Sequence, residues 1–156
     1  MKYLIIAALV IAAIVRIVLP WDYTFLNGEV RLNQVDSYFS MYLVDKLING
    51  EPVVNYNALT EYIIYGVTWL ITRGQPDSNT ADYVGALLNA IYGVITVLLV
   101  SFLTKNLFNK KVALVSIFLA SIMPGEFLVR SALGFTDHHA LELVFLSAEV
   151  STLTKE

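Results

Sequence analysis

The sequence predicts an all-α membrane protein with about four transmembrane helices and a long extracytoplasmic loop that holds surface helices. The first observation is the composition of the 156 residues, of which 57% are hydrophobic and 15% are charged, with a mean hydropathy of +0.67. A soluble domain carries about 25% charged residues, so this chain has too few polar side chains to cover a surface that faces water. The second observation is that the charges are sorted along the chain, with long apolar stretches between them.

The apolar stretches predict membrane spans at about residues 3–20, 80–104, 112–129 and 139–154. A helix needs about 20 apolar residues to cross about 30 Å of hydrocarbon. The first stretch follows a basic residue, as a signal peptide does, but it is long and lacks a small-residue cleavage site, which favours a retained anchor. The third continues past a Pro-Gly pair, and the fourth is short and carries two glutamates.

The loop charges predict the orientation of these spans. The loop from Lys105 to Lys111 carries three lysines and no acid, and the positive-inside rule places such a loop in the cytoplasm. Residues 20–82 then face outward, and their eight acidic and three basic residues give a charge of −5. The chain is therefore expected to be a multi-pass protein of the cell membrane with an acidic extracytoplasmic face.

The outer loop, residues 20–79, is expected to hold two surface helices. The first, at about 36–49, has apolar residues at spacings of three and four and is followed by Gly50, which suits a helix end. The second, at about 58–72, carries aromatic side chains that favour the headgroup level of a membrane. Thr80 is the predicted N-cap of the span that follows.

Acidic and histidine residues beside the predicted spans are the candidates for function. Asp137 and His139 lie where an outer loop meets the last helix, and a carboxylate and an imidazole so placed can converge on one divalent cation. Asp137 would equally serve as an N-cap. Asp36 is either a second carboxylate of the same site or the N-cap of the helix after it. Arg130 would balance the acidic pair, hold an anionic substrate or extend to the membrane interface.

Two kinds of function are excluded by composition. The chain has no cysteine, so it has no disulfide framework and no thiolate metal site. Its net charge of −3 leaves no basic face, so nucleic acid is not expected as a partner.

The order of these features carries a family resemblance. Asp36 opens the run Asp-Ser-Tyr-Phe after the first span, a surface helix ends near Pro52, and two closely linked spans follow. The block from Arg130 to Glu142, Arg-Ser-Ala-Leu-Gly-Phe-Thr-Asp-His-His-Ala-Leu-Glu, then resembles a second acidic motif in its Asp-x-His variant. Together they resemble, over essentially the whole chain, the N-terminal part of the oligosaccharyltransferase catalytic subunit of the archaeal type, the dolichyl-phosphooligosaccharide–protein glycotransferases.

The resemblance implies a GT-C glycosyltransferase fold and an activity. Such enzymes transfer an oligosaccharide from a dolichol phosphate or diphosphate carrier to asparagine in the Asn-x-Ser/Thr sequon of an acceptor polypeptide, within membrane lipid. The resemblance implies Mn²⁺ or Mg²⁺ held by Asp36, Asp137 and His139. It makes Asp36 and Asp137 catalytic, with Asp36 also contacting the acceptor amide. Arg130 would bind substrate.

Two departures from the family pattern leave alternatives open. The family often has a histidine or arginine one turn after its first acidic motif, where this chain has Phe39, Ser40 and Met41. The family also continues beyond Glu156 with further spans, a loop glutamate ligand and a sequon-reading domain, so the chain is expected to be a truncated N-terminal fragment that is inactive alone. The alternatives are another GT-C enzyme with a lipid-phosphate sugar donor, or a non-enzymatic small membrane protein whose outer face binds cations.

Overall fold

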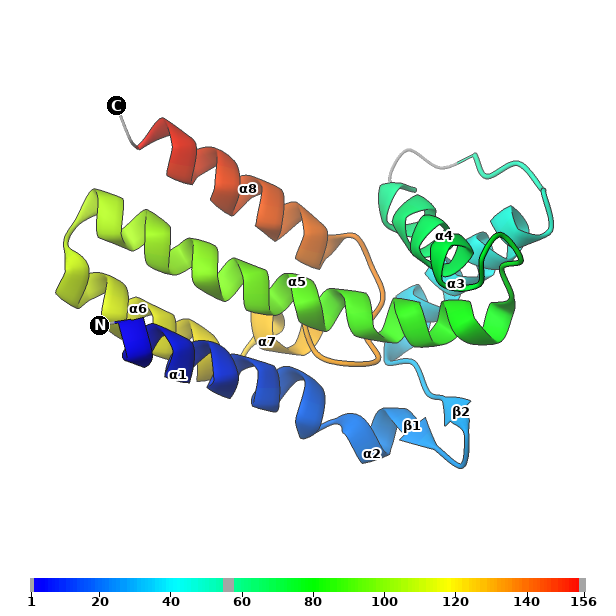
Figure 1. Cartoon of the computed structure of the whole chain (residues 1–156), viewed down its shortest axis with the longest axis horizontal. Helices are drawn as coiled ribbons and strands as arrows, with labels where there is room; N and C mark the ends of the chain where they lie inside the picture. Colours follow the sequence, from blue (N-terminus) through cyan, green and yellow to red (C-terminus); the bar gives the residue numbers. More distant parts are fainter. Residues whose placement is uncertain (1, 55–57, 155–156) are drawn as a thin grey trace.

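The computed structural model describes residues 2–54 and 58–154, and almost all of its regular structure is helical (Figure 1). In chain order the elements are α1 (Lys2–Ala13), the π-helix η1 (Ile14–Val18), α2 (Trp21–Thr24), β1 (Phe25–Leu26), β2 (Glu29–Val30), α3 (Gln34–Ile48), α4 (Leu59–Ile71), α5 (Ser78–Leu107), α6 (Lys110–Ile122), α7 (Glu126–Arg130) and α8 (His139–Leu153).

The long helix α5 is the centre of the fold. It packs against α1, α6 and α8 along most of its length, whereas α3 and α4 gather around its N-terminal end (Figure 1). Small residues let α1, α5 and α6 approach closely, in a cluster formed by Ala8, Ala12, Val97 and Ile117. A second cluster, which includes Met41, Val44, Ile64, Ala81 and Val84, joins α3 and α4 to the start of α5. The chain therefore has a bundle of long helices and, at one end of it, a smaller helical cap.

Two continuous helical segments are long and apolar enough to cross a membrane, Lys2–Thr24 and Ser78–Leu107. They contain the first and second predicted spans. The fourth predicted span corresponds to α8, which has 15 residues.

The third predicted span, 112–129, is wrong as a continuous helix. Helix α6 ends at Ile122, and α7 begins only at Glu126. The break has a local cause: Pro124 has no backbone N–H to donate, and Gly125 adopts φ +137°, a conformation that L side chains rarely adopt. The consequence for the site is that α7 becomes a separate short element that carries Arg130.

The expectation of a purely α-helical protein is corrected by one small antiparallel hairpin. Phe25 pairs with Val30 and Leu26 with Glu29, and the two residues between the strands, Asn27 and Gly28, have φ values of +56° and +83°. An Asn-Gly pair is a strong signal for a two-residue hairpin turn, so this element was detectable from the sequence.

Two predicted helix caps are also wrong. Helix α3 begins at Gln34 with Asn33 at the N-cap position, which places Asp36 within its first turn rather than at its cap. Helix α5 begins at Ser78, and the carboxylate of Asp77 accepts hydrogen bonds from the backbone N–H (2.9 Å) and hydroxyl (2.8 Å) of Thr80. Asp77 is therefore the N-cap residue of α5, and Thr80 is its hydrogen-bond partner. Asp36 is exposed, and its carboxylate is available for a role other than capping.

Candidate functional site

The structure brings Asp36, Asp137 and His139 to one cavity, although they lie far apart in the sequence. The cavity has a volume of about 130 Å³, and its wall also includes Ser40 and Glu61. Asp36 comes from the first turn of α3, Asp137 from the loop before α8, and His139 from the first residue of α8. The cavity thus lies where the helical cap meets the bundle.

Hydrogen bonds between the start of α3 and the loop before α8 fix this meeting. Asn33 donates its backbone N–H to the carbonyl of Gly134 (2.6 Å) and its side-chain amide to the carbonyl of Leu133 (3.2 Å). One turn on, the hydroxyl of Ser37 accepts the backbone N–H of Thr136 (2.9 Å). These residues flank Asp36 on one side and precede Asp137 on the other, so the hydrogen bonds hold the two segments that carry the carboxylates next to each other.

Gly134 is required for this close approach. It has φ +83°, and a Cβ at this position would lie 3.1 Å from the carbonyl oxygen of Arg31 and 3.0 Å from the hydroxyl of Thr24. A larger residue would be strained and would push the loop away from Thr24 and Arg31, which precede α3. The glycine three residues before Asp137 therefore contributes to the geometry of the site.

Asp137 is only 3% exposed and is held by three donors. Its Oδ1 accepts the backbone N–H of His139 (3.0 Å) and the side-chain amide of Asn89 (3.4 Å), and its Oδ2 accepts Nη1 of Arg130 (3.1 Å). The bond to His139 shows the expected cap-like contact, although the N-cap position of α8 belongs to His138. A carboxylate offers about four lone-pair positions, so one position of Asp137 stays available to a ligand.

Arg130 pairs with two carboxylates. Its Nε donates to Glu126 (2.9 Å) and its Nη1 to Asp137 (3.1 Å), while the guanidinium lies 5.7 Å from the ring centroid of Phe135. The hydrogen bond that Arg130 donates to Glu126 and then the charge of Asp137 hold the pKa of Arg130 above its ordinary value. Among the three roles left open by the sequence, the structure shows Arg130 balancing an acid of the site.

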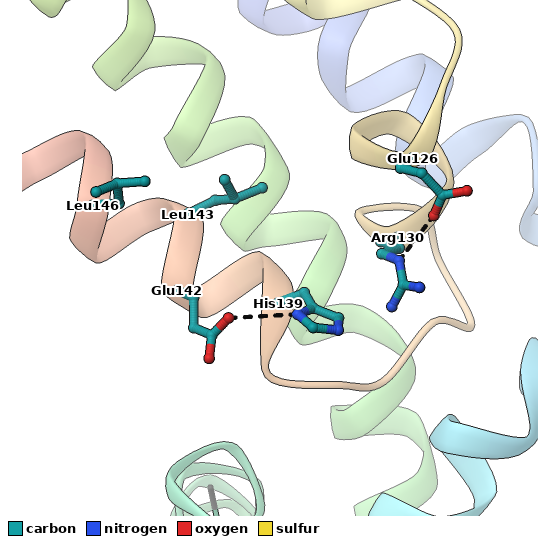
Figure 2. A pocket seen from close by; sticks show the side chains of 6 residues that line it. All are labelled: Glu126, Arg130, His139, Glu142, Leu143 and Leu146. Atoms are coloured by element: carbon teal, nitrogen blue, oxygen red, sulfur yellow. Dashed lines mark hydrogen bonds and ion pairs between the residues drawn. The ribbon is translucent and has the colours of Figure 1, made fainter.

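Arg130 and His139 also line a second, larger cavity of about 530 Å³ (Figure 2). Glu126 and Arg130 lie on α7, and His139, Glu142, Leu143 and Leu146 follow α8 on the other side. This cavity has charged groups at the end nearest Asp137 and leucine side chains farther along α8. His139 lines both cavities and so lies between them.

The metal-ligating atoms that lie closest together include only one of the three predicted ligands, His139. Ligand atoms of His138, His139 and Glu142 all lie within 4.8 Å of one another. Asp36, Asp137 and His139 do not form a second group of that closeness within residues 2–54 and 58–154. The structure therefore brings the three predicted ligands to one cavity without placing their donor atoms at bonding distances around a single point.

Glu61, in the first turn of α4, is a residue of the cavity that the sequence did not single out. It is 4% exposed, and its Oε2 has no hydrogen-bond partner in the described part of the chain. A carboxylate inside the apolar run Leu-Thr-Glu-Tyr-Ile-Ile was a usable signal, because a charge within such a helix is costly unless it has a purpose.

The chain was compared with known proteins. The family model "Oligosaccharyl transferase STT3, N-terminal" matches residues 3–155. The dolichyl-phosphooligosaccharide-protein glycotransferase 3 of Archaeoglobus fulgidus is 31% identical over an alignment that covers 97% of this chain and 19% of the relative.

Two solved structures of an Archaeoglobus fulgidus oligosaccharyltransferase also match, each with 27% sequence identity. The complex with an inhibitory peptide and a dolichol-phosphate has a TM-score of 0.85 and covers 99% of this chain and 19% of that one. The complex with Zn and sulfate has a TM-score of 0.83 and covers 97% of this chain and 21% of that one. The chain thus spans about a fifth of the length of the relatives that it matches.

Proposed function

The chain belongs to the oligosaccharyltransferase STT3 family, and on that premise we propose that it supplies part of the active site of an N-glycosylation enzyme. The reaction is transfer of an oligosaccharide from a dolichol phosphate or diphosphate carrier to the asparagine of an Asn-x-Ser/Thr sequon. The observation that supports this most directly is the convergence of Asp36, Asp137 and His139, from separate elements, on one cavity.

Asp36, Asp137 and His139 would hold Mn²⁺ or Mg²⁺ in this cavity. Two carboxylates and one imidazole suit such cations, and the cavity also contains a buried carboxylate oxygen, Oε2 of Glu61, that has no partner among residues 2–54 and 58–154. A nearby cation would compensate its cost. When bound, such an ion neutralises the negative charge that develops on the departing phosphate.

The protein's own residues orient the reacting groups. Asp137 is locked by Arg130, Asn89 and the N–H of His139, so its charge is fixed before substrate arrives, which is the arrangement that stabilises a transition state at least cost. Asp36 stands on a helix turn without such locks in the described contacts, and its carboxylate would accept a hydrogen bond from the acceptor amide. Arg130 would attract the carrier phosphate to the entrance of the larger cavity.

We also propose that α1, α5, α6 and α8 cross the cell membrane, with the active face outside. The helical segment Lys2–Thr24, which begins with α1, and helix α5 have spanning length, and α6 and α8 pack along α5. Asn89, in the N-terminal half of α5, donates to Asp137, whereas Lys105 lies in the last turn of the same helix. The site and the lysine loop therefore lie toward opposite ends of the bundle, as the loop charges predict.

Impermeant thiol labelling tests this topology, because residues 1–156 contribute no cysteine of their own to the reaction. Cysteine at Asn79, an exposed residue in the first turn of α5, should react from outside intact cells. Cysteine at Phe108, which is 67% exposed, should react only after the cells are opened. Labelling of both positions from outside would contradict the orientation.

The activity is tested with the protein in its full natural length. A lipid-linked oligosaccharide and a fluorescent sequon peptide are incubated with Mn²⁺, then with a chelator, then with Mn²⁺ restored. We expect transfer that stops on chelation and resumes with the metal. Transfer that continues at the same rate in the chelator would contradict the cation-dependent mechanism.

A further inference from the structure

Glu61 combines burial with an unsatisfied carboxylate. Glu61 lies on the buried face of α4, where the apolar Ile64, one turn away, is fully buried. Its Oε2 is shielded from solvent and accepts no hydrogen bond within the part of the chain that the structure describes. Buried charges are normally paired, hydrogen-bonded or bound to a metal, so this oxygen indicates a missing partner.

The missing partner would reach Glu61 through the cavity, because Glu61 is part of its wall. The wall has three carboxylates, from Asp36, Glu61 and Asp137, and two imidazoles, from His138 and His139. Arg130 is the cation nearest to this set, and it is engaged by Asp137 and Glu126. No ion pair within residues 2–54 and 58–154 involves Glu61. A positive ligand would therefore find an uncompensated negative charge here.

We propose that Glu61 is an additional oxygen ligand, supplied by α4, for the divalent cation of this site. The proposal rests on the function proposed above, which gives the cation only Asp36, Asp137 and His139. Mg²⁺ and similar hard cations need about six ligands, mostly oxygens. Asp137 has already accepted three hydrogen bonds, so a further free carboxylate oxygen has a clear use.

The size of the cavity agrees with this occupant. One water needs only about 10–15 Å³ of such space, and the cavity has about 130 Å³. A cation with several of its waters therefore fits between α3, α4 and the start of α8, and Glu61 can bind it directly or after a rotamer change. In the bound state the cost of burying Glu61 would be offset by the cation, whereas in the metal-free state it would remain.

This difference between the two states gives the test. Mn²⁺ binding to the full-length protein is followed by electron paramagnetic resonance, and metal-free thermal unfolding is measured in parallel. Glu61→Gln keeps the shape of the side chain and removes its charge. We expect the Kd for Mn²⁺ to rise by about 10-fold to 100-fold, while the metal-free melting temperature stays equal or rises because an unpaired buried charge is gone.

Two further variants complete the design. Glu51→Gln removes an exposed carboxylate of the same outer region, which pairs with Lys46 (3.9 Å), and should leave Mn²⁺ binding unchanged. Glu61→Asp keeps the charge on a shorter side chain and should bind Mn²⁺ with an affinity between those of the wild type and Glu61→Gln. Glu61→Asp also tests the proposal if Glu61→Gln does not fold.

The outcomes separate this inference from the function on which it rests. Wild-type protein that fails to bind Mn²⁺ contradicts the proposed cation site itself. Wild-type binding that is abolished by Asp36→Asn but unchanged by Glu61→Gln contradicts only the role of Glu61. A lower metal-free melting temperature for Glu61→Gln, with unchanged Mn²⁺ affinity, would show that Glu61 is a structural hydrogen-bonding residue.

Discussion

Arg16 and Glu61 are both charged side chains that the fold removes from water, but their surroundings differ. Arg16 is 0% exposed and donates to the hydroxyl of Ser131 (3.0 Å) and to the carbonyls of Ser121 (2.9 Å) and Ala120 (3.1 Å). Glu61 is 4% exposed, and its Oε2 receives no hydrogen bond from any described residue. A buried charge with its hydrogen bonds made stabilises structure, whereas one that lacks them indicates a site for a ligand.

The bonds of Arg16 connect the bundle to the site. Ala120 and Ser121 lie in the last turn of α6, where carbonyls have no partner within the helix. Ser131 directly follows Arg130, and the guanidinium of Arg16 also lies 4.9 Å from the ring centroid of Phe127. The π-helical turn η1 places Arg16 for these contacts. Arg16 thereby fixes both ends of the segment that carries Arg130, which in turn holds Asp137.

The largest expected effects are on the transfer rate, and they come from substitutions of residues in the cavity. Asp36→Ala and Asp137→Ala should each lower the transfer rate by about 10²-fold to 10³-fold, because each removes a negative charge that acts on the transition state. His139→Ala should cost less, since water can replace a neutral imidazole ligand. Rates of sequon-peptide transfer by the full-length protein measure this. Glu51→Ala is the control, and equal rates for Asp137→Ala and this control would show that Asp137 only caps α8.

Removal of the hydrogen-bonded charge of Arg16 should instead lower the free energy of unfolding. Arg16→Met keeps much of the side chain's length and deletes three hydrogen bonds to a charged group, each worth about 1.5–3 kcal/mol before any relaxation. We expect a loss of about 3 kcal/mol in the free energy of unfolding, measured by denaturant titration in detergent. Arg31→Met removes an exposed arginine and should change it little. Equal unfolding midpoints for the two variants would contradict the structural role of Arg16.

A smaller effect is expected at the glycine that makes room for these contacts. A Cβ on Gly93 would lie 2.5 Å from Cβ of Ser131 and 2.8 Å from Nε of Arg16. Gly93→Ala should therefore destabilise the protein by about 1–3 kcal/mol. Gly66→Ala is the matched helical control, because a Cβ there meets nothing within 4 Å, and it should stabilise α4 by about 0.5–1 kcal/mol. Thermal unfolding of both variants measures these changes. A Gly93→Ala protein as stable as the wild type would show that α5 and the Ser131 segment separate readily.

Local patterns predicted the long helices well, because their apolar composition and periodicity are local properties. The structure has helices within a few residues of the first two predicted spans, of the helix over 139–154 and of both outer-loop helices. The differences are also local in cause: the Asn27-Gly28 pair forms a hairpin turn, and Pro124 and Gly125 end the helix that the apolar composition alone extends. The N-cap of α5 is Asp77, three residues before the predicted Thr80.

The site could be predicted only in part. The common position of Asp36, Asp137 and His139 followed from the family resemblance and not from any spacing in the chain, since the contacts that join them run from α3 to the loop before α8. The environments of Glu61 and Arg16 depend on how α4 docks on α5 and how η1 meets the end of α6. Such tertiary contacts leave no periodic signal, and only the presence of a charge in an apolar helix pointed to them.

The central claim is that Asp36, Asp137 and His139 hold one divalent cation. The most direct measurement is an anomalous difference map collected at the manganese absorption edge from crystals of the full-length protein grown with Mn²⁺. We expect one strong peak in the cavity, bonded to both carboxylates and to His139. The Asp36 and Asp137 oxygens should then lie within about 6 Å of each other, given metal–oxygen distances of about 2.1 Å for Mg²⁺ and up to about 2.6 Å for Ca²⁺. A peak bound instead by His138, His139 and Glu142, or carboxylates of Asp36 and Asp137 that remain about 12 Å apart or more, several times those bond lengths, would contradict it.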